Sequence, residues 1–130
     1  MTTTNDRDLL VTVSGDTPTD TARVPEKPGS VAAVQYALLA GRPYAMTSDD
    51  LLHAAHRARG GEVDRAAFFA TPRACLRASP LVKQFGWGIH HDTDGRIALV
   101  AMESADYARL LADPAVTKRP GMRRHRARSA

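Results

Sequence analysis

The sequence predicts a single α+β domain, in which a small, mostly antiparallel sheet packs against three or four helices. Its 130 residues fit one domain, and a hydrophobic content of 43% is enough for an aliphatic core. Segments in which apolar and polar residues alternate lie among segments that begin with helix-capping residues. We expect strands at about residues 8–13, 73–78, 85–91 and 97–102.

Capping residues mark where the helices begin. Ser30 precedes an almost wholly apolar segment, which predicts a buried helix to about residue 40. Thr47 or Ser48 begins a second helix that reaches about residue 59. The loop before the first helix, residues 14–29, holds three prolines and is expected to lack secondary structure. Shorter helices are expected at about residues 63–70, 80–84 and 105–112.

The middle of the chain predicts a β-hairpin. Residues 85–91 alternate with period two, and the following Asp92-Thr93-Asp94-Gly95 has the composition of a turn. Residues 97–102 form the second strand. Because this strand is apolar on both sides, we expect it to be central in the sheet, with helices over both faces.

The turn sets the register of the hairpin, and the register assigns each side chain to a face. If Asp92 lies opposite Arg96, one face becomes apolar and the other carries two glycines. The expected pairs are His91 with Ile97, Ile89 with Leu99, Trp87 with Ala101, His90 with Ala98, Gly88 with Val100 and Gly86 with Met102.

The net charge of +4 is unevenly distributed. Six of the 18 Lys and Arg residues lie from Lys118 onward, which leaves 12 basic residues against 14 acidic ones before that point. We therefore divide the chain into a domain at 1–117 and a disordered basic tail at 118–130. The tail could contact nucleic acid or an acidic partner through counterion release. Its candidate residues are Arg119, Arg123, Arg124, Arg126 and Arg128.

Composition also indicates where the protein works. No apolar run approaches the roughly 20 residues that span a bilayer, so no membrane contact is expected. A single cysteine excludes an internal disulfide framework, and the polar N-terminus is not a secretory signal. We expect a cytoplasmic protein, either a monomer or a homodimer, because so small a sheet leaves an exposed edge strand.

Several motifs form an ordered series along the chain. They are Thr47-Ser48-Asp49-Asp50-Leu51-Leu52, Cys75-Leu76-Arg77-Ala78-Ser79-Pro80-Leu81 and Phe85-Gly86-Trp87-Gly88-Ile89-His90. With Thr2-Thr3-Thr4-Asn5 near the start and Met122-Arg123 near the end, this series resembles a family of small bacterial proteins, the domain of unknown function DUF6157. The resemblance covers nearly the whole chain and implies one intact domain, but it implies no activity, ligand or catalytic residue.

The segment around Ser79-Pro80 is the first candidate site. A helix N-terminus presents unpaired N–H groups that attract anions, and the Arg77 guanidinium could grip a carboxylate or phosphate with two hydrogen bonds. The glycine face of the hairpin would leave room for such a ligand. Alternatively, Arg77 pairs with a carboxylate such as Glu103, and the glycines admit a packed helix. The candidate ligand-binding residues are Arg73, Arg77, Ser79, Lys83, Trp87 and His91.

The histidines and the cysteine do not predict a metal site. Adjacent residues on a strand point to opposite faces, so His90 and His91 cannot easily ligate one metal together. His53, His56 and Cys75 lack the spacing of zinc ligands. We expect no metal and no cofactor.

The sequence carries no recognised catalytic motif, and it leaves open whether the protein is an enzyme. Cys75 is interpreted as a small buried hydrophobe rather than a nucleophile. His91 could act as a general base beside Asp92 or Asp94 if it lined a pocket; alternatively it flanks the turn, half in solvent. Two functions follow: a domain that binds a small, possibly anionic ligand, or an interaction module that uses the basic tail.

Overall fold

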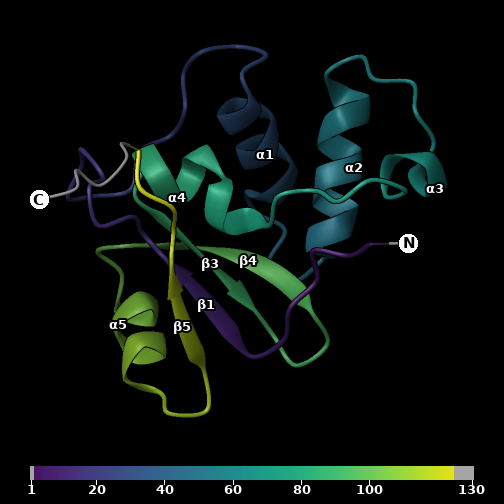
Figure 1. Cartoon of the computed structure of the whole chain (residues 1–130). Coiled ribbons are helices and arrows are strands. Elements are labelled where there is room, and N and C mark those ends of the chain that lie inside the picture. The colour runs from purple at the N-terminus through teal and green to yellow at the C-terminus, as the bar shows by residue number, and fades with distance from the viewer. Residues whose placement is uncertain (1, 125–130) are drawn as a thin grey trace, which may run out of the picture.

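The computed structural model describes residues 2–124 and forms an α+β domain (Figure 1). A five-stranded sheet carries α1, α2 and α4 on one face and α5 on the other. The strands are β1 (Leu9–Thr12), β2 (Met46–Thr47), β3 (Trp87–His91), β4 (Arg96–Ala101) and β5 (Thr117–Pro120). The helices are α1 (Val31–Leu39), α2 (Ser48–Ala58), α3 (Arg65–Phe68), the 3-10 helix η1 (Leu76–Ala78), α4 (Pro80–Gln84) and α5 (Ala105–Ala112).

The predicted hairpin register is confirmed. Strands β3 and β4 pair antiparallel, with Trp87 opposite Ala101 and Ile89 opposite Leu99. The turn is held by Asp92, whose Oδ1 accepts hydrogen bonds from the backbone N–H groups of Asp94 and Arg96, both at 2.9 Å. The register therefore follows from local turn chemistry.

Capping residues begin the helices largely as predicted. The Ser30 side chain accepts a hydrogen bond from the Ala33 N–H, and Thr47 forms a reciprocal capping box with Asp50 at the start of α2. The third helix is shorter than expected, because Asp64 caps it and only four residues follow. No helix among the described residues is long and apolar enough to cross a membrane.

The sheet is mixed rather than mostly antiparallel. Its order is β2-β4-β3-β1-β5, and β5 pairs parallel with β1 while the other pairings are antiparallel. We expected strand β4 to be central, but it is second from the edge of the sheet. The two-residue β2 is its outer neighbour. Helices do cover both of its faces.

Strand β5 corrects the expected start of the disordered tail at residue 118. The N–H of Thr117 donates to the Asp8 carbonyl at 2.8 Å, and the N–H of Gly121 donates to the Thr12 carbonyl at the same distance. An edge strand needs only backbone hydrogen bonds on one side, so its side chains can stay polar and no apolar pattern marks it; Arg119 is exposed and Lys118 is half-buried. Residues 125–130 lie outside the described part of the chain.

The prediction of a strand at residues 73–78 is also wrong. Residues Leu76–Ala78 form the 3-10 helix η1, in which the Ser79 N–H donates to the Leu76 carbonyl at 3.0 Å. Leu76 alone of these three is buried. Leu76 therefore anchors a turn that leads into α4.

Helix α1 is less buried than its composition predicts. Ala32, Gln35 and Leu39 are buried, but Val31 is 37% exposed and Tyr36 is half-buried. These two residues lie on different flanks of the helix: Val31 lies beside Leu52 of α2, and Tyr36 lies beside Trp87. The partly exposed Tyr36 flank forms one wall of a surface recess.

Gly88 fits only because it lacks a side chain. A Cβ there would lie 2.7 Å from Cε2 of Tyr107, whose ring crosses the strand from α5. We expect Gly88→Ala to lower the free energy of unfolding by about 1–3 kcal/mol through overpacking, measured by urea denaturation. Gly15→Ala is the matched control, because its Cβ would meet nothing closer than 3.9 Å. Equal stability of the two variants would contradict this packing.

Candidate functional site

The glycine face of the hairpin is filled. Tyr107 lies over Gly88, and its hydroxyl accepts a hydrogen bond from the Val13 N–H at 3.1 Å. At Gly86, a Cβ would lie 2.7 Å from the Thr21 carbonyl oxygen. The space in which the sequence placed an anionic ligand is thus occupied by the protein itself.

The basic residues of the first candidate site hold other parts of the fold. Arg77 Nε donates to the Pro120 carbonyl at 2.7 Å, and the Arg73 guanidinium lies 3.8 Å from the centre of the Phe68 ring. Glu103, the expected partner of Arg77, instead accepts a hydrogen bond from the Ala22 N–H, in the loop that precedes α1. Arg73 and Arg77 therefore do not converge on one ligand position.

Ser79 serves structure in two ways. Its hydroxyl accepts the N–H of Leu81 at the start of α4 and donates to Gln35 Oε1 at 2.6 Å. Both side chains are buried. Lys83 lies half-buried in the last turn of α4. Of the six candidate ligand residues, Trp87 alone lines the recess described next.

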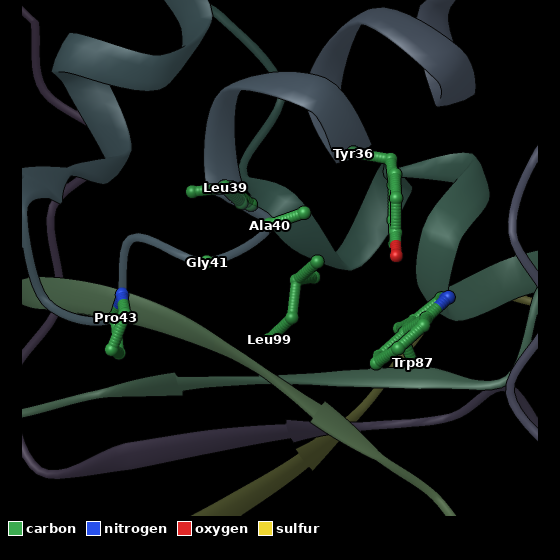
Figure 2. A pocket seen from close by; sticks show the side chains of 7 residues that line it. All are labelled: Tyr36, Leu39, Ala40, Gly41, Pro43, Trp87 and Leu99. Atoms are coloured by element: carbon green, nitrogen blue, oxygen red, sulfur yellow. The ribbon is translucent and has the colours of Figure 1, made fainter.

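An apolar recess lies between α1 and the outer part of the sheet (Figure 2). Figure 2 shows Leu99 rising from β4 between Trp87 and Pro43, with the Tyr36 hydroxyl beside the indole. The volume is about 260 Å³. We call it the Trp87 recess; it is lined by Tyr36, Leu39, Ala40, Gly41, Pro43, Trp87 and Leu99.

Local structure positions each wall of the Trp87 recess. The indole of Trp87 is held by a 2.8 Å hydrogen bond from Nε1 to the Arg23 carbonyl and by contact with the Tyr36 ring, 5.6 Å away. Gly41 takes a positive φ of 72° after α1, which lets the chain turn sharply and leaves the end of α1 open. The register of the hairpin brings Leu99 to the same face as Trp87.

The recess can hold one apolar group and one polar atom. Typical ligand pockets measure about 300–1,000 Å³, so this smaller recess suits a single ring or a branched aliphatic group. Within residues 2–124, the Tyr36 hydroxyl makes no hydrogen bond, and it is free to bind a ligand atom. Of the residues that line the recess, the sequence predicted only Trp87 as a ligand-binding residue. The position of Tyr36 in an almost wholly apolar helix was a signal that could have indicated the recess.

A second hollow, of about 230 Å³, lies on the other side of β4, against α5. Tyr44 donates to or accepts from His90 Nδ1 at 2.8 Å there, and Asp106 and Arg109 form an exposed ion pair at 3.2 Å. Burial raises the pKa of Tyr44 and lowers that of His90. We call this the α5-side hollow; its walls include Pro43, Tyr44, Ala98, Val100, Asp106 and Arg109.

His91 lies in the core rather than at a pocket. It is 1% exposed, and neither ring nitrogen has a hydrogen-bond partner among the described residues. Burial lowers its pKa to about 4. The alternative that His91 flanks the turn half in solvent is therefore wrong: its strand places it on the face that the helices cover.

The remaining candidates are dispersed. Cys75 is half-buried, and within residues 2–124 no three His, Cys, Asp or Glu side chains could hold a metal ion together. Arg119, Arg123 and Arg124 are exposed, and the Arg124 N–H donates to Asp16 Oδ1 at 2.8 Å. Arg126 and Arg128 lie outside the described residues. Nucleic-acid contact by these arginines stays a prediction.

The buried state of His91 predicts a pH dependence of stability. The unfolded chain takes up a proton near pH 6.5, whereas the folded protein does so only near pH 4. The unfolded state therefore binds more protons between these values. We expect the free energy of unfolding to fall by roughly 3 kcal/mol from pH 7 to pH 4 through this group, measured by urea denaturation at each pH.

His91→Leu is the control for that titration. It removes the titrating group, so the fall between pH 6.5 and pH 4 should flatten. A smaller slope from His90 should remain, because burial lowers its pKa as well. An unchanged slope in the variant would show that His91 is not the group responsible.

Comparison with known proteins identifies a family but no activity. A model described as a family of unknown function, DUF6157, matches residues 1–127. No curated protein and no solved structure matches the chain. Any functional assignment must therefore start from the geometry above.

Proposed function

The chain belongs to the family of unknown function DUF6157, and we propose that it is a binding domain whose Trp87 recess holds one apolar group of a ligand. The group is the size of a single ring or a branched aliphatic chain. The observation that carries the proposal is an apolar recess of about 260 Å³ with one unbonded hydroxyl, that of Tyr36, beside the indole.

The surroundings of the recess support an apolar ligand group over an anion. Its walls carry no Lys or Arg side chain. The guanidinium group of Arg77, which the sequence offered for an anion, is bonded to the Pro120 carbonyl. Among the side chains that line the recess, only the Tyr36 hydroxyl could donate a hydrogen bond to a phosphate or carboxylate. This proposal keeps the small-ligand class predicted from the sequence and changes the recognised group.

A planar or branched group fits the recess physically. The Trp87 indole and the Tyr36 ring are tilted by 50° to each other and present apolar surface. Burying a ring against such surface contributes about 25 cal/mol for each Å² removed from water. The Tyr36 hydroxyl can add one hydrogen bond, which would orient a ligand that has a polar atom next to its apolar group. A cytoplasmic location stays a prediction from composition.

Binding can be read from the side chain of the sole tryptophan. We expect p-cresol and 3-methylbutanol to shift the NMR signal of the Trp87 indole N–H and of the Leu99 amide, while inorganic phosphate and acetate do not. Leu99→Gln should weaken p-cresol binding at least about tenfold, because it places a polar group against the apolar ligand.

Leu111→Gln is the matched control, because Leu111 is 44% exposed and does not line the recess. It should bind p-cresol like the unmodified chain. Shifts of Trp87 with phosphate and none with p-cresol would favour an anion site instead. Failure of every probe would remove the proposal.

A further inference from the structure

The two edges of the sheet differ in their protection. Strand β5 carries Lys118 and Pro120, and its outer side is covered where Arg77 Nε donates to the Pro120 carbonyl. The Met122 N–H donates in turn to the Arg77 carbonyl at 2.7 Å. Lysine, proline and covering segments are the usual means by which proteins prevent another strand from pairing at an edge.

The opposite edge has little cover. Strand β2 pairs only with Arg96 and Ile97, the first two residues of β4. The next four residues read Ala-Leu-Val-Ala, with no charge and no proline. A hydrophobic strand edge of this kind is a template for pairing with another chain.

The ladder between β3 and β4 shows which backbone groups face outward. Asp92 N–H donates to the Arg96 carbonyl and Met102 N–H to the Gly86 carbonyl, so residues 96 and 102 face β3. Because hydrogen-bonded pairs alternate in an antiparallel ladder, the groups of Leu99 and Ala101 point away from β3.

Leu99 and Ala101 together have four outward backbone groups, and three of them are free. The fourth, the Ala101 carbonyl, accepts the Ser104 N–H at 3.0 Å. Within residues 2–124, no hydrogen bond engages the N–H and carbonyl of Leu99 or the N–H of Ala101. A row of backbone donors and acceptors at strand spacing is matched by another extended backbone.

The free edge runs between the two hollows. The Trp87 recess lies on the side of α1 and the α5-side hollow on the opposite side, and Leu99 borders both. Successive side chains of a strand point to opposite faces. An added strand would thus direct one side chain into the apolar recess and its two neighbours toward Tyr44 and the Asp106–Arg109 pair.

We propose that the free edge of β4 binds an extended segment of a partner protein as an additional antiparallel strand, with one apolar side chain in the Trp87 recess. This inference rests on the proposed function and names its ligand class. The residue opposite Leu99 exchanges both hydrogen bonds with it, and its side chain shares the face of Leu99. The segment carries a Leu, Ile, Met or Phe there, flanked by polar residues.

A second copy of this chain fits the edge less well. A two-fold axis at Val100 would set each Leu99 N–H against an Ala101 carbonyl that Ser104 already occupies. An axis at Leu99 would place Ala101 of the second copy opposite Ile97, where the Tyr44 N–H is bonded at 2.9 Å. A peptide whose end stops short of Tyr44 avoids the second obstacle, and at the Ala101 carbonyl it loses one hydrogen bond, whereas the two-fold arrangement at Val100 loses two.

The test uses the full chain and a phage-displayed library of random twelve-residue peptides. We expect enriched peptides to share one Leu, Ile, Met or Phe between polar residues. In the free protein we expect the Leu99 and Ala101 amides to exchange rapidly, because no hydrogen bond engages them within residues 2–124. A synthetic copy of an enriched peptide should slow this exchange. Exchange is followed by NMR at each amide.

Ala101→Pro is the edge variant, because it removes a free N–H and adds a ring where the strand would lie. It should weaken peptide binding at least about tenfold, whereas Ala101→Ser, which keeps the N–H, should not. Should Ala101→Pro fail to fold, the peptide carries the test. N-methylation of its apolar residue should abolish binding, and N-methylation of the next residue, whose N–H points away, should not.

The outcomes separate this inference from the proposed function. Binding of p-cresol without enrichment of any peptide overturns the strand-pairing inference alone. Peptide binding that leaves Leu99 and Ala101 exchange unchanged also overturns it. Protection of these amides in the free protein that grows with concentration would identify a second copy as the occupant and overturn it too. Peptide protection without any p-cresol shift would contradict only the recess as a small-ligand site.

Discussion

The register between β3 and β4 is the constraint on which the rest of the structure depends. Asp92 holds the turn, and side chains alternate strictly from there along both strands. Trp87 and Leu99 therefore share the face of α1, while Gly88 faces Tyr107. A shift by one residue would exchange these faces, remove the recess and drive side chains into the Tyr107 ring.

The recess exists because an apolar helix is covered incompletely. Helix α1 buries Ala32 and Leu39 against the core, and its Tyr36 flank is left to solvent beside Trp87. An exposed apolar flank normally costs free energy that another element would recover by covering it. This flank lies beside the unbonded Tyr36 hydroxyl and near the free edge of β4, and our two proposals rest on these neighbouring features.

The arginines show how tertiary structure redirects residues that sequence reasoning offered as ligands. Arg77 closes the β5 edge, and Arg73 lies over the Phe68 ring. The Arg77 guanidinium connects two segments that are distant in the sequence, whereas the Arg73 guanidinium contacts a residue five positions before it. Charge and proximity in the sequence could not distinguish an anion site from these contacts, because a carbonyl and an aromatic face satisfy a guanidinium as well.

Local chemistry by itself determined the hairpin, its register and most helix starts, since turns and caps involve residues within four positions of one another. It also offered Trp87 as a candidate ligand-binding residue, and Trp87 lines the recess. Tertiary structure alone decided the parallel pairing of β5, the turn at Leu76–Ala78 and the position of β4 near an edge. These features depend on which strand edge a distant segment reaches, and no local pattern encodes that choice. The recess could not be predicted for the same reason, because its walls come from α1, β3 and β4, which are distant in the sequence.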